Sequence, residues 1–368
     1  MANARHIAPN DGRSWVSGPV DVPLLDCTIP QFFADNVKRH ADNDAIVFPQ
    51  LGVRWSYSQF ARRVDRMAAG LLALGLYKGG RIGIWSPNRP EWLLVQFATA
   101  RIGLILVNIN PAYRRSEVEY ALNKVGARAL ILAPGFKSSN YIEMLRDLAP
   151  ELTHAVPGRL KAERLPALRT VIHLGKDEQP GMYSFDQVMD RGGGGHRYRL
   201  DGISAALSQH DAINIQFTSG TTGAPKGVIR PTAGHLVALN WTMSAIYGVK
   251  PGDIYWAASD VGWVVGHSYI CYAPLIHGNT TVVFEGKPVG TPDAGVFWRV
   301  IEQHKCVALF TAPTAFRAIK REDPEGVLRS EEHTSELQSR SDLVCRRLPE
   351  NKKTPRCDTH RVQGHTQS

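Results

Sequence analysis

The chain has 368 residues, of which 43% are apolar and 21% are charged, and this balance is typical of a folded globular protein. Its formal net charge of +9 comes from lysines and arginines that are scattered and not clustered, which weakens the case for nucleic-acid binding. A small polyanionic ligand accounts for the positive charge equally well. No apolar run approaches the ~18 residues of a membrane span, and residues 1–15 lack the apolar core of a secretory signal.

Helical and strand patterns alternate through the first 175 residues. Apolar residues at helical spacing predict helices, and short continuous apolar runs predict buried strands. Helices are predicted at 60–74, 91–102 and 116–125, and strands at 81–85, 104–107, 129–132 and 168–174. Such alternation is typical of a parallel sheet covered on both faces, so we predict an α/β fold.

A glycine run at 192–195 and its polar surroundings predict a flexible linker over residues 186–205. The linker would separate a first α/β subdomain, residues 1–185, from a second one, residues 206–328. In the second, strands are predicted at 213–217, 280–284 and 307–311, and helices at 235–247 and 296–304. We therefore expect layered α/β subdomains, and the sequence carries no indication of oligomeric state.

Five cysteines are spread over the chain without the close spacing that binds a metal. They are Cys27, Cys271, Cys306, Cys345 and Cys357. Widely separated cysteines are typical of a reducing compartment. We expect free thiols, no metal held by side chains, and a cytoplasmic location.

The most informative segment follows the strand predicted at 213–217. Residues 218–227 read Thr-Ser-Gly-Thr-Thr-Gly-Ala-Pro-Lys-Gly. Glycine lets the backbone approach a ligand closely, and successive N–H groups with neighbouring hydroxyls form an anion-binding nest. The nest is predicted at Thr218, Ser219, Gly220, Thr221, Thr222 and Gly223. Because Lys226 adds a compact positive charge, we predict a loop that binds a polyphosphate, with Lys226 as its charge partner.

Two other interpretations of this loop were weighed against that prediction. The P-loop of nucleotide hydrolases has glycine before its lysine and Ser or Thr after it, whereas Pro225 and Gly227 stand at those positions here, which excludes a P-loop. An ordinary turn rich in Ser, Thr and Gly leaves Lys226 as a solvated loop lysine. A plain turn does not account for the ordered hydroxyls with a lysine at their far end.

The loop resembles the phosphate-loop signature of the AMP-forming adenylating enzymes, which include acyl-CoA synthetases, firefly luciferase and peptide-synthetase adenylation domains. Residues 22–217, with Gly-Val-Arg-Trp-Ser-Tyr at 52–57, are similar to medium-chain fatty-acyl-CoA synthetases. Residues 228–325, with Asp-Val-Gly-Trp-Val-Val-Gly-His-Ser-Tyr at 260–269, are similar to propionyl- and acetyl-CoA synthetases. This change predicts a hybrid of two genes, and the alternative is one natural gene with mixed features. The mixture leaves the acyl chain length open.

The resemblance implies a two-step ligation of a carboxylic acid. The carboxylate attacks the α-phosphorus of ATP to give acyl-AMP and pyrophosphate, and the thiol of CoA then displaces AMP. Loop 218–227 would hold the β- and γ-phosphates, with Lys226 as the catalytic charge partner, and Mg²⁺ would neutralise phosphate charge. The implied substrates are therefore a short- or medium-chain acid, ATP and CoA.

In the same family, a strand-and-turn matching residues 260–269 lines the acyl pocket. Trp263 matches an aromatic residue that gates the ATP site, and Val264, Val265 and Gly266 would form the pocket wall. His267 would contact substrate or phosphate, and Asp260 and Arg230 are weaker candidates. Two alternatives stay open: Trp263 as a core residue, and His267 as a hydrogen-bonded structural histidine.

The family's later motifs are not found between residues 314 and 368. These motifs are an adenine-binding segment, a Tyr-Gly-x-Thr-Glu-like motif, a ribose-binding Thr-Gly-Asp, and a mobile domain with a catalytic lysine. We expect a truncated chain whose second subdomain lacks strands and whose ligase activity and solubility are low. The alternative is a non-catalytic product with at most weak nucleotide binding.

The last segment differs from the rest of the chain in having little apolar periodicity. Residues 329–348 resemble the translation of a ligation adapter used in short-read sequencing libraries, with Arg-Ser-Glu-Glu-His-Thr-Ser-Glu-Leu-Gln-Ser at 329–339 and Leu-Val-Cys-Arg at 343–346. We therefore expect residues 329–368 to be a non-native or disordered tail. The alternative is a natural polar tail.

Overall fold

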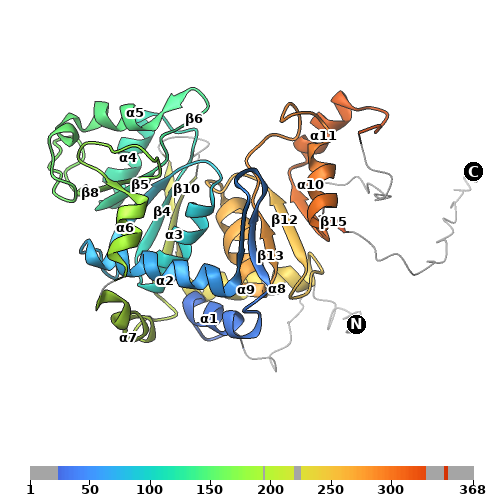
Figure 1. The fold of residues 1–368 in the computed structure, drawn as a ribbon, viewed down its shortest axis with the longest axis horizontal. Coiled ribbons are helices and arrows are strands. Elements are labelled where there is room, and N and C mark those ends of the chain that lie inside the picture. Colours follow the sequence, from blue (N-terminus) through green and yellow to red (C-terminus); the bar gives the residue numbers. More distant parts are fainter. Residues whose placement is uncertain (1–23, 194, 219–224, 329–343, 347–368) are drawn as a thin grey trace, which may run out of the picture.

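The computed structural model describes residues 24–193, 195–218, 225–328 and 344–346. Two β-sheets lie side by side with helices packed against them (Figure 1). In spatial order, the seven-stranded sheet consists of β11 (Lys226–Pro231), β10 (Ala212–Thr218), β4 (Ile105–Ile109), β3 (Arg81–Trp85), β5 (Ala129–Leu132), β8 (Thr170–His173) and β9 (Tyr183–Ser184). All its neighbouring strands are parallel except β10 and β11, which pair antiparallel.

The second sheet has six strands and also draws on both ends of the chain. In spatial order these are β15 (Val344–Arg346), β14 (Ala308–Thr311), β12 (Ile254–Ala258), β13 (Thr280–Val282), β1 (Asp44–Phe48) and β2 (Val53–Ser56). A separate short hairpin joins β6 (Gly135–Phe136) to β7 (Ser139–Asn140). The mixture of largely parallel sheets and helices confirms the predicted α/β fold class.

The helices cover both sheets, and several begin at a residue whose side chain accepts a hydrogen bond from an N–H group of the first turn. They are α1 (Ile29–Arg39), α2 (Tyr57–Ala73), α3 (Pro90–Arg101), α4 (Arg115–Val125), α5 (Tyr141–Leu148), α6 (Phe185–Arg191), α7 (Leu200–Ala205), α8 (Thr232–Ala245), α9 (Ala273–His277), α10 (Val296–His304) and α11 (Pro313–Glu322), with short helical segments η2 (Pro49–Leu51), η3 (Pro150–Thr153), η4 (Gly195–Arg199) and the π-helical η5 (Gly266–Tyr272). Helix α2, for example, starts with a reciprocal capping box between Ser56 and Gln59. None of the helices in the described residues has the length and apolar character needed to cross a membrane.

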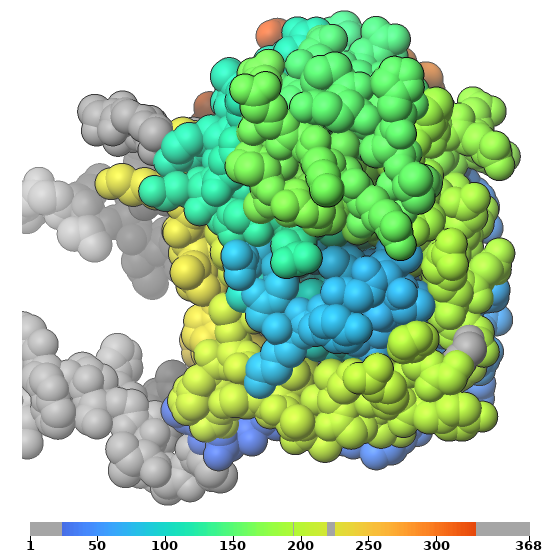
Figure 2. All heavy atoms as spheres, turned by 90° about the vertical axis from the view of Figure 1, so that its left-hand side faces the viewer, coloured from blue at the N-terminus to red at the C-terminus, as the bar shows by residue number. Residues whose placement is uncertain are grey.

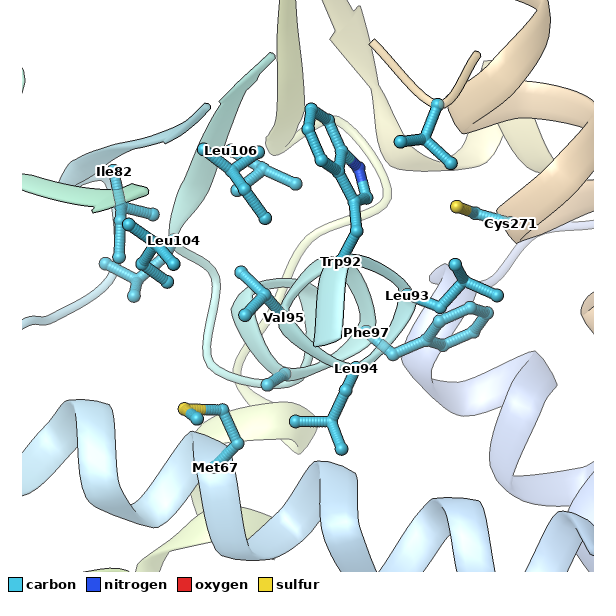
Figure 3. Packing of buried hydrophobic residues seen from close by; sticks show 14 of the residues in the cluster. Met67, Ile82, Trp92, Leu93, Leu94, Val95, Phe97, Leu104, Leu106 and Cys271 are labelled. Atoms are coloured by element: carbon cyan, nitrogen blue, oxygen red, sulfur yellow. The ribbon is translucent and has the colours of Figure 1, made fainter. Parts of the chain in front are cut away.

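Helix α3 lies between the two sheets and forms the centre of the core. Figure 3 shows Met67 of α2 on one side of it, Ile82 and Leu106 of the larger sheet on another, and Cys271 of η5 on a third. Trp92 of α3 is fully buried. Because α3 is surrounded, its apolar residues occupy all faces rather than one stripe, and a single hydrophobic cluster joins the two sheets.

The sheets do not follow the subdomain boundary that the sequence suggested. Hairpin β1–β2 comes from the first segment but pairs with β13 of the second, with Val47 opposite Val282. Strand β10 comes from the second segment but pairs with β4 of the first, with Ile215 opposite Val107. The N-terminal hairpin therefore covers β13 at this edge of the second sheet. The expectation that this sheet lacks strands found in the family stays a prediction.

Residues 186–205 are largely helical rather than a flexible linker. They include most of α6, η4 and α7. Gly192 packs against α2 so closely that a Cβ atom would lie 1.8 Å from the carbonyl oxygen of Arg66. The glycine therefore permits close helix packing instead of chain mobility.

Most of the tail, residues 329–343 and 347–368, lies outside the described residues. The backbone of β15 pairs antiparallel with β14, with residues 344–346 opposite 308–310. The adapter-like origin of the tail stays a prediction.

Candidate functional site

Hairpin β10–β11 places both ends of the predicted phosphate loop next to each other. Thr218 at the end of β10 lies opposite Lys226 at the start of β11, and the Thr218 hydroxyl donates to the Lys226 carbonyl oxygen over 3.4 Å. The Tyr120 hydroxyl of α4 donates to the carbonyl oxygen of Pro225 over 3.2 Å. Ser219, Gly220, Thr221, Thr222 and Gly223 lie outside the described residues. The hairpin thus anchors the loop at the carboxyl end of β10.

Lys226 is exposed and forms no ion pair with any residue that the structure describes. Since no carboxylate holds it, its ammonium group is available to a ligand at the carboxyl end of the sheet. The carboxyl edge of a parallel α/β sheet is also where such folds bind ligands. The sequence did not predict that Lys226 begins a strand.

The two faces of β10 have different partners. Ile215 and Phe217 pack against α4, in a cluster that includes Ala121. Asn214 and Gln216 alternate with them on the other face. From this face Gln216 donates through Nε2 to the carbonyl oxygen of Gly262, in the segment after β12, over 3.0 Å. The polar face of β10 therefore holds the turn that the sequence linked to the acyl pocket.

Residues 260–267 form a tight turn that leads into helix, not the expected strand-and-turn. The Asp260 carboxylate accepts from the Gly262 N–H over 3.0 Å, and its carbonyl oxygen accepts from the Trp263 N–H over 3.0 Å. A Cβ atom on Gly266 would lie 2.0 Å from the Asp260 carbonyl oxygen, so only glycine fits where η5 begins. The apolar sequence of this segment fits a helix buried on several sides as well as it fits a strand.

Trp263 and Val264 are 52% and 43% exposed, and Val265 is half-buried. The exposure of Trp263 excludes the alternative in which it is an ordinary core residue. The side chains of Trp263, Val264 and Val265 lie between the turn and η5, next to the buried Gly266. Their contact with an acyl group stays a prediction.

His267 lies in the interior. Its Nδ1 is 3.2 Å from the carbonyl oxygen of Trp263, and its Nε2 is 2.9 Å from Nη1 of Arg230 on β11. Burial, with smaller contributions from His235 and Arg230, lowers the pKa of His267 well below its usual value. A neutral ring that donates through Nδ1–H and accepts at Nε2 satisfies both contacts. These contacts are the ones expected if His267 is a hydrogen-bonded structural histidine. Through them His267 connects η5 to β11.

Arg230 and His235 complete this buried polar cluster. Arg230 also donates through Nη1 to Oδ1 of Asn214 over 3.1 Å, and burial lowers its pKa. The ring of His235 stacks on that of His267 with centroids 5.8 Å apart. Burial and the Arg230 charge lower the pKa of His235 to about 4. Nothing in the sequence pattern indicated that these three side chains meet.

A cavity of about 680 Å³ opens beside Asp260, where β12 and β14 end. Glu285 and Lys137 also line it. Burial raises the pKa of Asp260, and burial also raises the pKa of Glu285, with Asp260 as a further cause. Asn88 fixes the rim, since its side chain donates to the carbonyl oxygens of Ser259 and Phe284 and its N–H donates to Glu285.

Within the described ranges, no three His, Cys, Asp or Glu residues gather where they could hold a metal ion. The family's Mg²⁺ therefore has no carboxylate cluster here that fits it.

Solved structures with the same fold are adenylating enzymes. Acetoacetyl-CoA synthetase from Streptomyces lividans superposes with a TM-score of 0.65 at 21% identity, over 80% of this chain and 44% of that one. The anthranilate CoA ligase AuaEII, solved in complex with anthranoyl-AMP, superposes with a TM-score of 0.65 at 21% identity, over 81% of this chain and 52% of that one. At this identity the likeness shows the fold.

The sequence pattern that describes the AMP-binding enzymes matches residues 33–348, and the chain belongs to this family. It is 42% identical over 279 residues to acyl-CoA synthetase short-chain family member 3 of Rattus norvegicus, covering 74% of this chain and 39% of that protein. It is 39% identical over 312 residues to medium-chain acyl-CoA ligase ACSF2 of Danio rerio, covering 82% and 49%. The chain thus spans less than half the length of these relatives. Short-chain and medium-chain relatives are thus both found. The assignment of one resemblance to residues 22–217 and of the other to residues 228–325 stays a prediction, as does the hybrid origin.

Proposed function

We propose that this chain carries the phosphate-binding part of an ATP site and part of an acid site of an AMP-forming acid–CoA ligase. Its substrates would be a short- or medium-chain carboxylic acid, ATP and CoA. The observation that carries the proposal is hairpin β10–β11, which brings Thr218 and Lys226 together on either side of a loop rich in glycine and hydroxyl groups.

The proposed chemistry at the loop is electrostatic. Joining a carboxylate to a phosphate brings two anions together, so the protein must position them and offset their repulsion. The loop N–H groups and hydroxyls would bind the β- and γ-phosphates, and the exposed Lys226 ammonium would pair with their oxygens. Mg²⁺, when bound to the polyphosphate, supplies further positive charge.

The acid would lie against the turn after β12. Trp263, Val264, Val265 and Gly266 present a bulky aromatic ring beside small side chains, which favours a short acyl chain. We assign His267 a positioning part in this proposal, because its contacts to the Trp263 carbonyl oxygen and to Arg230 fix the turn against β11. Direct contact of His267 with substrate would require the buried ring to become accessible.

Calorimetric titration of the full chain with ATP and magnesium tests the loop. We expect saturable binding that the Lys226→Ala variant weakens about tenfold, a loss of ~1.4 kcal/mol. Lys320→Ala, which removes an exposed lysine of α11, is the matched control and should leave the affinity unchanged. Equal affinities for the wild type and Lys226→Ala would remove Lys226 from the site.

Complete turnover is a separate question, because the chain spans less than half of its relatives' length. We propose that the chain by itself releases little or no pyrophosphate with acetate, propionate, butyrate or octanoate. Robust release with any of these acids would show that the described part suffices for adenylation. ATP binding without release would instead support a non-catalytic, nucleotide-binding product.

We retain a reducing, cytoplasmic compartment as a proposal. Cys27, Cys271 and Cys306 are free thiols, and two of them are buried. The two relatives named above, from Rattus norvegicus and Danio rerio, are mitochondrial proteins. Fractionation of cells that produce the chain at native level would decide between the two compartments.

A further inference from the structure

A cavity of about 410 Å³ lies at the end of the larger sheet opposite the phosphate loop. It forms where β5 and β8 begin, whereas the loop follows the last residue of β10. These strands run parallel within one sheet, so their first and last residues lie at opposite ends of it. The cavity opens on the face shown in Figure 2, between the blue surface that follows α2 and the green surface of residues 150–170.

Four basic side chains line this cavity, which we call the basic cavity: Arg128, Arg159, Lys161 and Arg169. No acidic side chain of the described residues lines it. The four cations also form no ion pair with any described residue, although Arg164 in the same segment pairs with Glu119. Their mutual repulsion is therefore not offset by the protein, and a bound anion would offset it.

The backbone that carries these side chains is held firmly. The carbonyl oxygen of Arg128 accepts from the N–H groups of Arg169 and Thr170, over 2.9 and 3.2 Å, and the Arg169 carbonyl oxygen accepts from the N–H of Leu160 over 3.0 Å. The Arg169 guanidinium donates through Nη1 to the carbonyl oxygens of Pro166 and Leu168, which leaves its other N–H groups for a ligand. Three segments of the chain thus converge at fixed positions.

The lining also selects the kind of anion. Arginine presents a planar fork that matches phosphate oxygens, and three arginines with one lysine provide donors from several directions. Leu74 and Leu76 form an apolar wall on the α2 side. The volume exceeds that of a lone phosphate and suits a phosphate group with a small organic part. We infer that the basic cavity binds a small phosphorylated metabolite, at a site separate from the proposed nucleotide loop.

Calorimetry of the full chain in a buffer of low ionic strength tests this inference, with inorganic pyrophosphate and with AMP as probes. All titrations use the Lys226→Ala background, which weakens binding at the phosphate loop, and the Arg128→Gln/Arg159→Gln comparison assigns any remaining binding to the basic cavity or to the loop. We expect saturable binding of at least one probe, and at least tenfold weaker binding in Arg128→Gln/Arg159→Gln. The matched control, Arg62→Gln/Arg197→Gln, removes two exposed arginines outside the cavity and should change the affinity less than twofold.

Three calorimetric outcomes overturn the inference. They are no saturable binding of either probe, equal affinity in the Arg128→Gln/Arg159→Gln variant, and an equal loss in the control, which would indicate attraction by net charge alone. Retained thermal unfolding of the variants checks that they fold.

A second measurement needs no substitution. A saturating probe should slow acetylation of Lys161 by an amine-reactive reagent at least fivefold, as read by mass spectrometry, while the exposed Lys320 reacts unchanged. Unaltered reactivity of Lys161 would also overturn the inference. Protection by an acidic peptide but by neither phosphate probe would replace it with a protein-docking surface.

Discussion

The centre and the edge of the larger sheet are built in contrasting ways. Strand β3 pairs with β4 on one side and β5 on the other, and four of its five residues are buried. Strand β11 pairs with β10 alone among the described strands, and its residues are mostly exposed. The centre therefore carries much of the packing energy, whereas the edge leaves a loop and its lysine open to a ligand.

The edge also resists unwanted pairing. An exposed strand edge invites association with another chain, and charged residues and proline discourage it. Strand β11 carries Lys226 and Arg230 and ends at Pro231. The same residues that keep the edge open for a ligand thus keep it from extending the sheet.

The largest effect should come from the centre of the sheet. Ile84 of β3 is fully buried, with Asn108 and Ile131 beside it on the neighbouring strands. Ile84→Ala should lower the free energy of unfolding by about 3–4 kcal/mol, because it removes apolar contact and leaves a cavity. Urea unfolding followed by circular dichroism measures this, and a loss under ~1 kcal/mol would mean that the centre is not tightly packed.

A smaller effect is expected beneath the edge, where β11 meets η5. The pKa of His235 falls to about 4 in the folded chain, against about 6.5 when unfolded. The contribution of the buried, neutral His235 to the free energy of unfolding is therefore fully present above pH 6.5. It is lost as the pH falls toward 4, because the unfolded chain then binds a proton that the folded chain does not. Between pH 7 and pH 5 this loss should be about 2 kcal/mol. The His235→Gln variant should lose correspondingly less stability over this range.

Urea unfolding of both proteins at pH 7 and pH 5 makes the comparison. Subtracting the two results removes the contribution of titrating groups that do not interact with His235, whereas His267, whose pKa His235 helps to lower, is counted together with it. His154→Gln, at an exposed position, is the control and should keep the wild-type pH dependence. Identical pH dependence in wild type and His235→Gln would show that His235 is solvated rather than buried.

The smallest effect should come from the edge itself. Ile229 of β11 is 63% exposed, so Ile229→Ala removes little buried surface. We expect a loss of less than about 1 kcal/mol, chiefly from the weaker strand preference of alanine. The same urea experiment as for Ile84 applies, and equal losses at the two positions would erase the contrast between centre and edge.

The central elements could be predicted because the local pattern of apolar residues in the sequence indicates that they are buried. The strands predicted at 81–85 and 129–132 coincide with β3 and β5, since each is a short apolar run. The helix at 296–304 coincides with α10, whose apolar stripe faces one side. Such segments can be identified without knowledge of their neighbours.

The remaining features depend on partners far away in the sequence. Strand β11 is mostly exposed and has no buried apolar run, so only its pairing with β10 defines it. The apolar segment that forms η5 looks the same whether it folds as a strand or as a buried helix. The cluster of Arg230, His235 and His267 needs three elements to meet, and no local pattern records that meeting. The phosphate loop was predicted from its residues, and its binding role stays a prediction.

Hairpin β1–β2 has a consequence for how the molecule can be divided. Because β1 pairs with β13 and β10 pairs with β4, a cut at the glycines near 192–195 would separate part of each sheet from the strands that it pairs with. The halves should need each other to acquire structure, and during synthesis the N-terminal hairpin must wait for residues 280–282 before it can dock. Two separately produced fragments would therefore fold on mixing, as complements, rather than as domains.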